Sequence, residues 1–398
     1  MLFRKKRIYA DAAAATPLSP RVWAELVRLL GHYSNPGALH RGGVEAREEI
    51  DAARAKVAST LGCHTDEVVF VASGTEANNL AIQGTLRPLL KKHGELHAIT
   101  SAIEHQSILE PLLALEEEGL YLTVLPVDEK GLVSAQALKE ALTDETVFVS
   151  IQMVNSEIGV IEPIRDLVKE VRHARKARTE GLPLYTHVDA SQAPLWLSLA
   201  VEKLGIDMLT LDGQKILGPK GVGALYVRRG VELEAIIHGG GQERGLRGGT
   251  ENLPLIGAFA IALRDAQVGV TARVENVAHV RDFLWQEIQK YIPGVLLNGP
   301  AVSDAGTRVA NNLHISIPNL DGEMAVIALA AEGIATSTRS ACSVGDEEPS
   351  HVMRAIGVPE KLLKTGIRIT LLPDITKKDA KYITRALFEI AERYRVGI

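Results

Sequence analysis

The chain has 398 residues, of which 46% are hydrophobic and 23% are charged, and its formal net charge at pH 7 is −5. This composition is typical of a soluble globular protein and excludes a disordered or collagen-like chain. The one short basic run, Arg4–Arg7, argues against direct binding of nucleic acid through a charged surface. Apolar stretches such as Leu255–Leu263 are shorter than the roughly 20 residues of a membrane helix, so we expect no membrane contact. No apolar segment follows the basic run, so we expect no secretory signal and a cytoplasmic protein.

Two cysteines, Cys63 and Cys342, are too few for a disulfide framework and have no CxxC spacing. They indicate a reducing compartment, where a lone cysteine is either buried or reactive. Cys63 follows the end of a predicted helix, and we interpret it as structural. Cys342 lies in the segment 335–350, which is rich in Ser, Thr, Ala, Gly and acidic residues. This composition predicts a mobile, exposed loop, in which a thiol would be accessible.

Short apolar runs alternate with helical patterns over the first two-thirds of the chain. Strands are predicted at Val68–Ser73, His97–Thr100, Tyr121–Leu125, Val147–Met153, Leu184–Asp189, Asp207–Leu211 and Val222–Arg228. Helices are predicted at Val44–Leu61, Glu76–His93, Gln106–Glu118 and Ile164–Arg178. The alternation favours an α/β fold with a mostly parallel seven-stranded sheet sandwiched by helices. The turn between the last two strands is rich in Gly and Pro and too short for a helix, so that pair should be antiparallel.

The pattern changes after Thr250. The predicted elements are a long helical stretch from Leu253 to Tyr291, strands at Asn311–Ser316 and Gly366–Thr370, and helices at Glu323–Glu332 and Thr376–Tyr394. We therefore predict a large domain at 1–260 and a smaller α+β C-terminal domain at 261–398 that carries the cysteine loop. The first residues of the chain are expected to pack with the smaller domain.

Polar residues gather at the carboxyl ends of the predicted strands, where open α/β sheets bind ligands. The turn Ser73-Gly74-Thr75-Glu76 opens a helix and could bind a phosphate, or Thr75 could form an ordinary N-cap. His187 and Asp189 share one strand face, as a functional pair or as a satisfied structural pair. Lys215 lies on a Gly-flanked turn and could form a Schiff base or be solvated. No metal site is expected, because Gly94 between His93 and His97 argues against a helical pair of ligands.

An anion-binding turn, a strand-end aspartate and a turn lysine are together what pyridoxal phosphate requires. The phosphate anchors the cofactor, the aspartate holds the pyridine nitrogen protonated, and the lysine carries the aldehyde as an imine.

The motifs resemble those of the cysteine desulfurases of the class V aminotransferase family, both in their residues and in their order, over nearly the whole chain. The motifs are Tyr9-Ala-Asp-Ala-Ala-Ala-Ala-Thr-Pro17, Asn35-Pro36, Gly74-Thr75-Glu76, Glu104-His105, Val154-Asn155-Ser-Glu157-Ile-Gly159, His187-Val-Asp189-Ala-Ser-Gln192, Lys215-Ile-Leu-Gly-Pro-Lys-Gly221, His238-Gly-Gly-Gly-Gln-Glu-Arg-Gly245, Arg247-Gly-Gly-Thr250, Ser340-Ala-Cys342, Glu348-Pro-Ser-His351 and Ile367-Arg368.

The resemblance implies a large domain of pyridoxal-phosphate fold type I and the conversion of L-cysteine to L-alanine. Lys215 would hold the cofactor, His105 would stack on its ring and assist proton transfer, and Cys342 would take the sulfur as a persulfide. The remaining implied ligands are Gly74 and Thr75 for the phosphate, Thr250 of the neighbouring subunit for the same phosphate, Asp189 for the ring nitrogen, Asn155 and Gln192 near the ring hydroxyl, and Asn155 and Arg368 for the substrate carboxylate.

The resemblance also implies a homodimer that passes sulfur to acceptor proteins, either an iron–sulfur scaffold or a carrier for tRNA thiolation. A selenocysteine lyase or another class V lyase remains an alternative, since either could keep Lys215 and Cys342. A degenerate, non-catalytic paralogue that binds a partner is a third reading, favoured by one departure described next.

Three positions depart from the family pattern. Asp212 and Gln214 stand where the family usually has Ser and His, both of which help to bind the cofactor phosphate. Gln214 can still donate a hydrogen bond. An ionised Asp212 at about 4 Å from a phosphate would cost roughly 4 kcal/mol at an effective dielectric near 20. The third departure is Leu371-Leu372-Pro373, where a Gly-Arg pair is common. We expect these changes to affect cofactor affinity more than reaction type.

Overall fold

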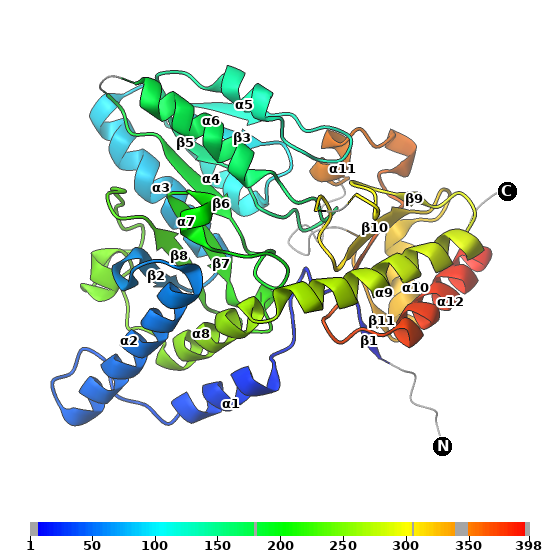
Figure 1. Ribbon diagram of the computed structural model, residues 1–398, viewed down its shortest axis with the longest axis horizontal. Helices are drawn as coiled ribbons and strands as arrows, with labels where there is room; N and C mark the ends of the chain where they lie inside the picture. Colours follow the sequence, from blue (N-terminus) through cyan, green and yellow to red (C-terminus); the bar gives the residue numbers. More distant parts are fainter. Residues whose placement is uncertain (1–6, 179–180, 305, 339–348, 395–398) are drawn as a thin grey trace.

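The computed structural model describes residues 7–178, 181–304, 306–338 and 349–394 (Figure 1). Within these ranges, a seven-stranded central sheet has the order β2-β8-β7-β6-β5-β3-β4. Its strands are β2 (Val68–Val71), β3 (Leu96–Ser101), β4 (Leu120–Leu125), β5 (Thr146–Ser150), β6 (Tyr185–Asp189), β7 (Met208–Asp212) and β8 (Gly223–Val227). Strand β8 is antiparallel to both neighbours, β2 and β7, and the other pairs are parallel. The predicted mostly parallel sheet and its antiparallel pair are confirmed.

Helices cover both faces of this sheet. One face packs against α3 (Gly74–His93) and α4 (Gln106–Glu117) in one apolar cluster. The other face packs against α2 (Arg41–Leu61), α6 (Ile164–Ala177) and α8 (Leu253–Gln267) in a second cluster. Because both faces are covered, β2, β3, β5, β7 and β8 are buried along their whole length. This explains why those strands appear as nearly continuous apolar runs in the sequence.

The stretch predicted to be helical from Leu253 to Tyr291 is helical over nearly its whole length, but the structure divides it into two helices. The first, α8, ends at Gln267, and α9 (Val270–Tyr291) begins after Gly269, whose φ is 65°. A residue without a Cβ adopts this left-handed conformation at little cost, so Gly269 allows the chain to turn. The two helices meet at 73°. Among the described residues no single helix is long and apolar enough to cross a membrane. The bent pair of α8 and α9 reaches the required length and apolar content only when its two helices are counted together.

The C-terminal unit follows α9, which leads away from the central sheet in Figure 1. Its antiparallel sheet has the order β12-β10-β9. The elements are β9 (Leu296–Leu297), β10 (Asn312–Ser316), α10 (Gly322–Ala331), β11 (Ile334–Ala335), α11 (His351–Ala355), β12 (Gly366–Thr370) and α12 (Lys377–Tyr394). Strand β1 (Ile8–Tyr9) pairs in parallel with β11, so the start of the described chain joins this unit. The boundary predicted near residue 260 falls inside α8 and stays a prediction.

Among the described residues, four short helices have no counterpart in the sequence-based prediction. They are α1 (Pro20–Leu29), α5 (Ala135–Ala141), α7 (Val201–Leu204) and α11 (His351–Ala355). Helices of this length are marginal alone and depend on tertiary packing, which a local pattern does not show. Helix α1 packs on α8 through the buried Val22 and Leu29.

Candidate active site

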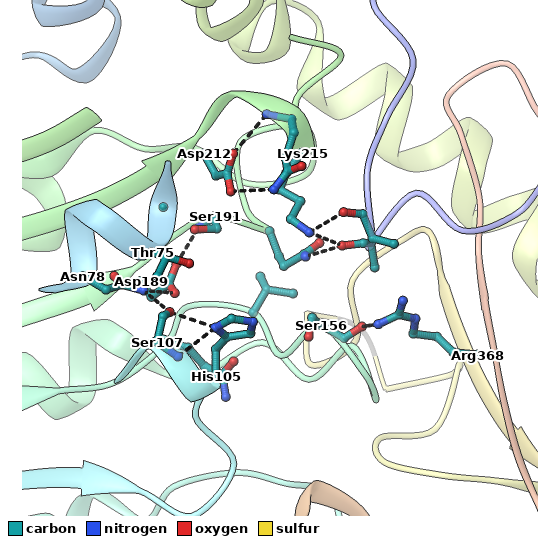
Figure 2. Close-up of a pocket in the computed structure, with 17 residues that line it drawn as sticks. Thr75, Asn78, His105, Ser107, Ser156, Asp189, Ser191, Asp212, Lys215 and Arg368 are labelled. Carbon is teal, nitrogen blue, oxygen red and sulfur yellow. Dashed lines mark hydrogen bonds between the residues drawn. The ribbon is translucent and has the colours of Figure 1, made fainter. Parts of the chain in front are cut away.

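A cavity of about 260 Å³ opens where β6 and β7 end, between the central sheet and the C-terminal unit (Figure 2). Eight of the predicted site residues line it: Gly74, Thr75, His105, Asp189, Gln192, Gln214, Lys215 and Arg368. They come from the first turn of α3, the N-cap of α4, the end of β6 and the loop after it, the turn after β7, and β12. The carboxyl ends of parallel strands are the usual ligand-binding edge of an open α/β sheet, and this cavity lies at that edge.

Lys215 ends the short 3₁₀ helix η2 (Gly213–Lys215), directly after β7. Its Nζ donates to the carbonyl oxygens of Ala13 at 2.7 Å and Ala14 at 2.6 Å. The N-terminal segment is fixed to this turn, because Thr16 Oγ1 donates to the Gln214 carbonyl at 2.9 Å. The half-buried ammonium therefore lies at the cavity wall, held by backbone oxygens of a distant part of the chain.

A chain of hydrogen bonds connects Asp189 to His105 (Figure 2). The Nδ2 group of Asn78 donates to Asp189 Oδ2 and to Ser107 Oγ, both at 2.8 Å. Ser107 Oγ lies 2.8 Å from His105 Nδ1, and the Ser107 backbone N–H donates to the same nitrogen at 3.1 Å. Since Nδ1 accepts these bonds, a neutral His105 ring carries its proton on Nε2. The acid and the histidine are thereby oriented as one unit.

The first turn of α3 forms the wall of the cavity next to the end of β7. Ser73 is the N-cap, since its hydroxyl accepts the Glu76 N–H at 3.1 Å. The alternative that Thr75 caps this helix is therefore wrong, and its hydroxyl lines the cavity instead. A Cβ on Gly74 would lie 3.0 Å from Ser191 Oγ and 3.1 Å from Asp212 Cβ, so only glycine fits without movement. The N-terminus of α3 thus presents its backbone to the cavity.

Asp212, one of the departures from the family pattern, is buried at 7% exposure and lines the same cavity. Its Oδ1 accepts the Gln214 backbone N–H and its Oδ2 accepts Gln214 Nε2, each at 3.1 Å. The carboxylate is therefore retained in the cavity by the turn that carries Lys215.

Arg368 brings a positive charge from β12 to the cavity, and its side chain is 1% exposed. One terminal nitrogen donates to Asp11 Oδ1 at 2.9 Å and the other to the Ser156 carbonyl at 3.1 Å. Its Nε is buried without a hydrogen-bond partner among the described residues. A buried guanidinium with a spare donor is suited to binding a carboxylate.

Three predicted residues are not part of this cavity as described. The Asn155 amide is engaged by the Ile103 carbonyl and by the N–H groups of Glu157 and Ile158, all at 2.9 Å. Thr250 is exposed and lines a separate cavity with Arg247 and Glu251. Cys342 lies outside the described residues. The roles expected for these three stay predictions.

His187, the strand partner of Asp189, is fully buried and lies outside the cavity lining. It bonds Ser150 Oγ at 2.9 Å and Thr210 Oγ1 at 3.0 Å, and it stacks on Phe148. Burial lowers the pKa of His187 to about 4, against the opposing effect of Asp189. His187 is therefore a neutral, satisfied residue of the sheet.

Glu104, directly before His105, is completely buried. It accepts the Ser101 hydroxyl at 2.6 Å and the Gln152 N–H at 3.0 Å. Burial raises the pKa of Glu104 well above its usual value, more than these bonds lower it. Its backbone carbonyl also bonds His351 Nε2 at 3.0 Å, which connects the start of α11 to the segment that carries His105.

The sequence-based reasoning missed Asn78, Ser107 and Asp11 as members of the site. Asn78 lies four residues after Gly74, one helical turn along, so it shares the face of Gly74. That spacing was a usable signal. The contact between Asp11 and Arg368 joins residues 357 positions apart and has no local signal.

A family model described as aminotransferase class-V matches residues 8–383 of the chain. The cysteine desulfurase IscS of Dictyoglomus turgidum is 40% identical over 392 residues, which cover 98% of this chain and 96% of that protein. The cysteine desulfurase IscS of Methanosarcina thermophila is 36% identical, and the match covers 98% of this chain and 93% of that protein. A solved structure described as a NifS-like protein is 32% identical with a TM-score of 0.89, and the match covers 98% of this chain and 100% of that one. The structure of SspA in complex with cysteine is 33% identical with a TM-score of 0.79, and the match covers 92% of this chain and 99% of that one. The chain therefore belongs to the cysteine desulfurases of the class V aminotransferase family.

Proposed function

We propose that this chain is a pyridoxal-phosphate-dependent cysteine desulfurase, which forms L-alanine from L-cysteine and holds the sulfur as a persulfide on Cys342. The observation that carries the proposal is the convergence of Lys215, Asp189, His105 and Arg368 on one cavity. The similarity to proteins named cysteine desulfurase supports this substrate over selenocysteine.

The residues of the cavity suit pyridoxal phosphate. The first N–H groups of a helix have no partner within the helix, so α3 and the Thr75 hydroxyl offer donors for a phosphate. Asp189 would pair with the ring nitrogen, and Lys215 would bind the aldehyde. Asn78 Oδ1 and Arg368 Nε are buried without a hydrogen-bond partner among the described residues, as expected where a ligand completes the site.

Bound there, pyridoxal phosphate supplies an electron-withdrawing ring that stabilises negative charge on the substrate. The chain supplies the rest. Arg368 would bind the substrate carboxylate and orient the amino acid. His105 would exchange a proton at Nε2, because its Nδ1 is engaged by Ser107. The Cys342 thiolate would form the S–S bond of the persulfide as the Cβ–S bond of the substrate breaks.

The proposed functional unit is a cytoplasmic homodimer that passes sulfur to acceptor proteins. Support comes from α1, which exposes Trp23 at 57% and Val27 at 49%, and from Leu30 directly after it, which is 63% exposed. The following segment exposes Tyr33 and Leu39, each at 96%. Exposed apolar patches of this kind mark interaction surfaces. Thr250 lines a different cavity from Lys215 in the single chain, as expected if it completes the site of a neighbouring subunit.

The test is incubation of the purified protein with L-cysteine, followed by measurement of alanine and by mass spectrometry of the tryptic peptides. The expected result is one alanine per sulfur transferred and an added sulfur atom on the peptide that contains Cys342. Lys215→Ala should form neither product, and Cys342→Ser should form no persulfide. Added sulfur on the Cys63 peptide, or persulfide formation by Lys215→Ala, would contradict the proposal.

A further inference from the structure

The chain places a carboxylate of its own where an anionic group would bind. Asp212 is the last residue of β7 and lies against the first turn of α3. Its Oδ2 is 3.3 Å from the position that a Cβ on Gly74 would occupy. The N-terminus of a helix attracts anions, so the phosphate of a bound cofactor and Asp212 would share one small region.

Asp212 has little freedom to leave this region. Both of its oxygens accept hydrogen bonds from Gln214, one from the backbone N–H and one from the side-chain amide. The residue is 7% exposed, and the Gly74 backbone is packed against its Cβ. A phosphate that binds beside α3 would therefore meet a fixed carboxylate.

The other charged groups around the cavity have identified partners. Asp189 accepts from Asn78 and from the Ser191 N–H, and Arg368 is paired with Asp11. On α3, Glu76 accepts from Arg247 and from the Ala72 N–H. From the remaining sides, His105 bonds Ser107, and Lys215 bonds the carbonyls of residues 13 and 14. The hydrogen bonds identified for Asp212 itself come from neutral groups of Gln214.

We propose that Asp212 takes up one proton from solvent when the phosphate group of pyridoxal phosphate binds. Two contacting negative charges repel, whereas a protonated carboxyl can donate its O–H to a phosphate oxygen. No other bond changes in this step. The inference rests on the proposed function, and it makes cofactor affinity decrease as pH rises.

The experiment is calorimetric titration of the full-length, cofactor-free protein with pyridoxal phosphate, in pairs of buffers that differ in ionisation enthalpy. The difference in heat between the two buffers gives the number of protons bound per site. Asp212→Asn is the matched control, because the amide keeps the shape of the side chain but does not ionise. At pH 6, wild type should take up more protons per site than Asp212→Asn, by up to one. Across pH 5 to 6.5, its affinity should decrease more steeply than that of the variant, by up to about tenfold per pH unit.

Pyridoxal has the same ring but no phosphate, so it tests whether the phosphate causes the proton uptake. It should give the same proton number with wild type and Asp212→Asn. The phosphate itself ionises with a second pKa near 6, so the difference between the two proteins counts the protons that the Asp212 carboxylate adds to the pair of groups. Asp212→Ser should also bind pyridoxal phosphate more tightly than wild type at pH 8, and it replaces the Asn variant if that one does not fold.

Equal proton numbers for wild type and variant with pyridoxal phosphate would overturn the inference and leave the proposed function standing. A difference that persists with pyridoxal would also overturn it, since the phosphate would then not be the cause. If neither protein bound pyridoxal phosphate, and borohydride reduction left no adduct on Lys215, the proposed function would fail and the inference with it.

Discussion

Arg368 is a buried cation whose charge is balanced by one residue from the other end of the chain. Removing one partner of a buried pair leaves an uncompensated charge, which typically costs about 3–5 kcal/mol. Asp11→Ala should therefore lower the free energy of unfolding by roughly 3 kcal/mol and raise the KM for L-cysteine, because the guanidinium loses its orientation. Denaturant unfolding and steady-state kinetics measure these two effects.

The control is Asp66→Ala, which removes an Asp–Arg pair that is 48–57% exposed. Exposed pairs contribute about 0–1 kcal/mol, so this variant should be nearly as stable as wild type. Equal losses of unfolding free energy in the two variants would show that the burial of Arg368 does not determine the cost of removing its partner.

Cys63 should be chemically inert in the native protein. Burial, assisted by Glu67 and Asp66, raises the pKa of its thiol to about 12. At pH 8 only about one thiol in ten thousand is then ionised, and the thiolate is the reactive form. In a Cys342→Ser background, iodoacetamide should modify Cys63 only after denaturant is added, as followed by mass spectrometry. Rapid modification of the folded variant would reverse the assignment of Cys63 as structural.

At the scale of elements, the break between α8 and α9 depends on Gly269. A Cβ there would meet no atom within 4 Å, so the cost of a substitution arises from the positive φ rather than from a clash. Gly269→Ala should lower stability by about 1–2 kcal/mol and leave binding of the cofactor unchanged. Thermal unfolding and cofactor titration are the measurements. An unchanged melting temperature would show that the break tolerates a side chain.

Glu162, just before α6, gives stability a pH dependence that one variant can isolate. Burial raises its pKa to about 8, against the opposing hydrogen bond from Val133 and with a smaller further rise from Asp128. The folded protein then binds this proton more tightly than the unfolded chain, so stability decreases as pH rises from about 4.5 to 8. Glu162→Gln should remove roughly 3 kcal/mol of this decrease between pH 4.5 and pH 7. Urea unfolding of both proteins at the two pH values tests this, and parallel curves would contradict it.

The central sheet could be predicted because its information is local: each strand is a short apolar run, and each crossover has a helical period. The same patterns did not show the turn at Gly269, since an isolated glycine inside a periodic stretch can be tolerated in a helix. The site was predictable where residues follow a strand, as Asp189 and Lys215 do. It was not predictable where side chains meet across the fold, as Asn78 meets Ser107 and Asp11 meets Arg368.

For the whole molecule, the exposed apolar face of α1 predicts association of two chains. Trp23→Glu places a charge on that face without disturbing the buried side of the helix, which contains Val22 and Leu29. In sedimentation velocity it should shift the protein from dimer toward monomer, and desulfurase activity should decrease in parallel if the sites are shared. A variant that stays dimeric would show that another surface holds the chains together.

Shared sites make a sharper prediction. Lys215→Ala and Thr250→Ala should each be nearly inactive as homodimers. In a mixed dimer, one site combines Lys215 of the second variant with Thr250 of the first, and that site is complete. Because the other site lacks both residues, mixed dimers should recover up to about half of the wild-type activity per dimer. Differently tagged chains, co-expressed and purified through both tags, provide this species. Activity no greater than that of the homodimers would show that Thr250 and Lys215 act within the same subunit, so that the sites are not shared.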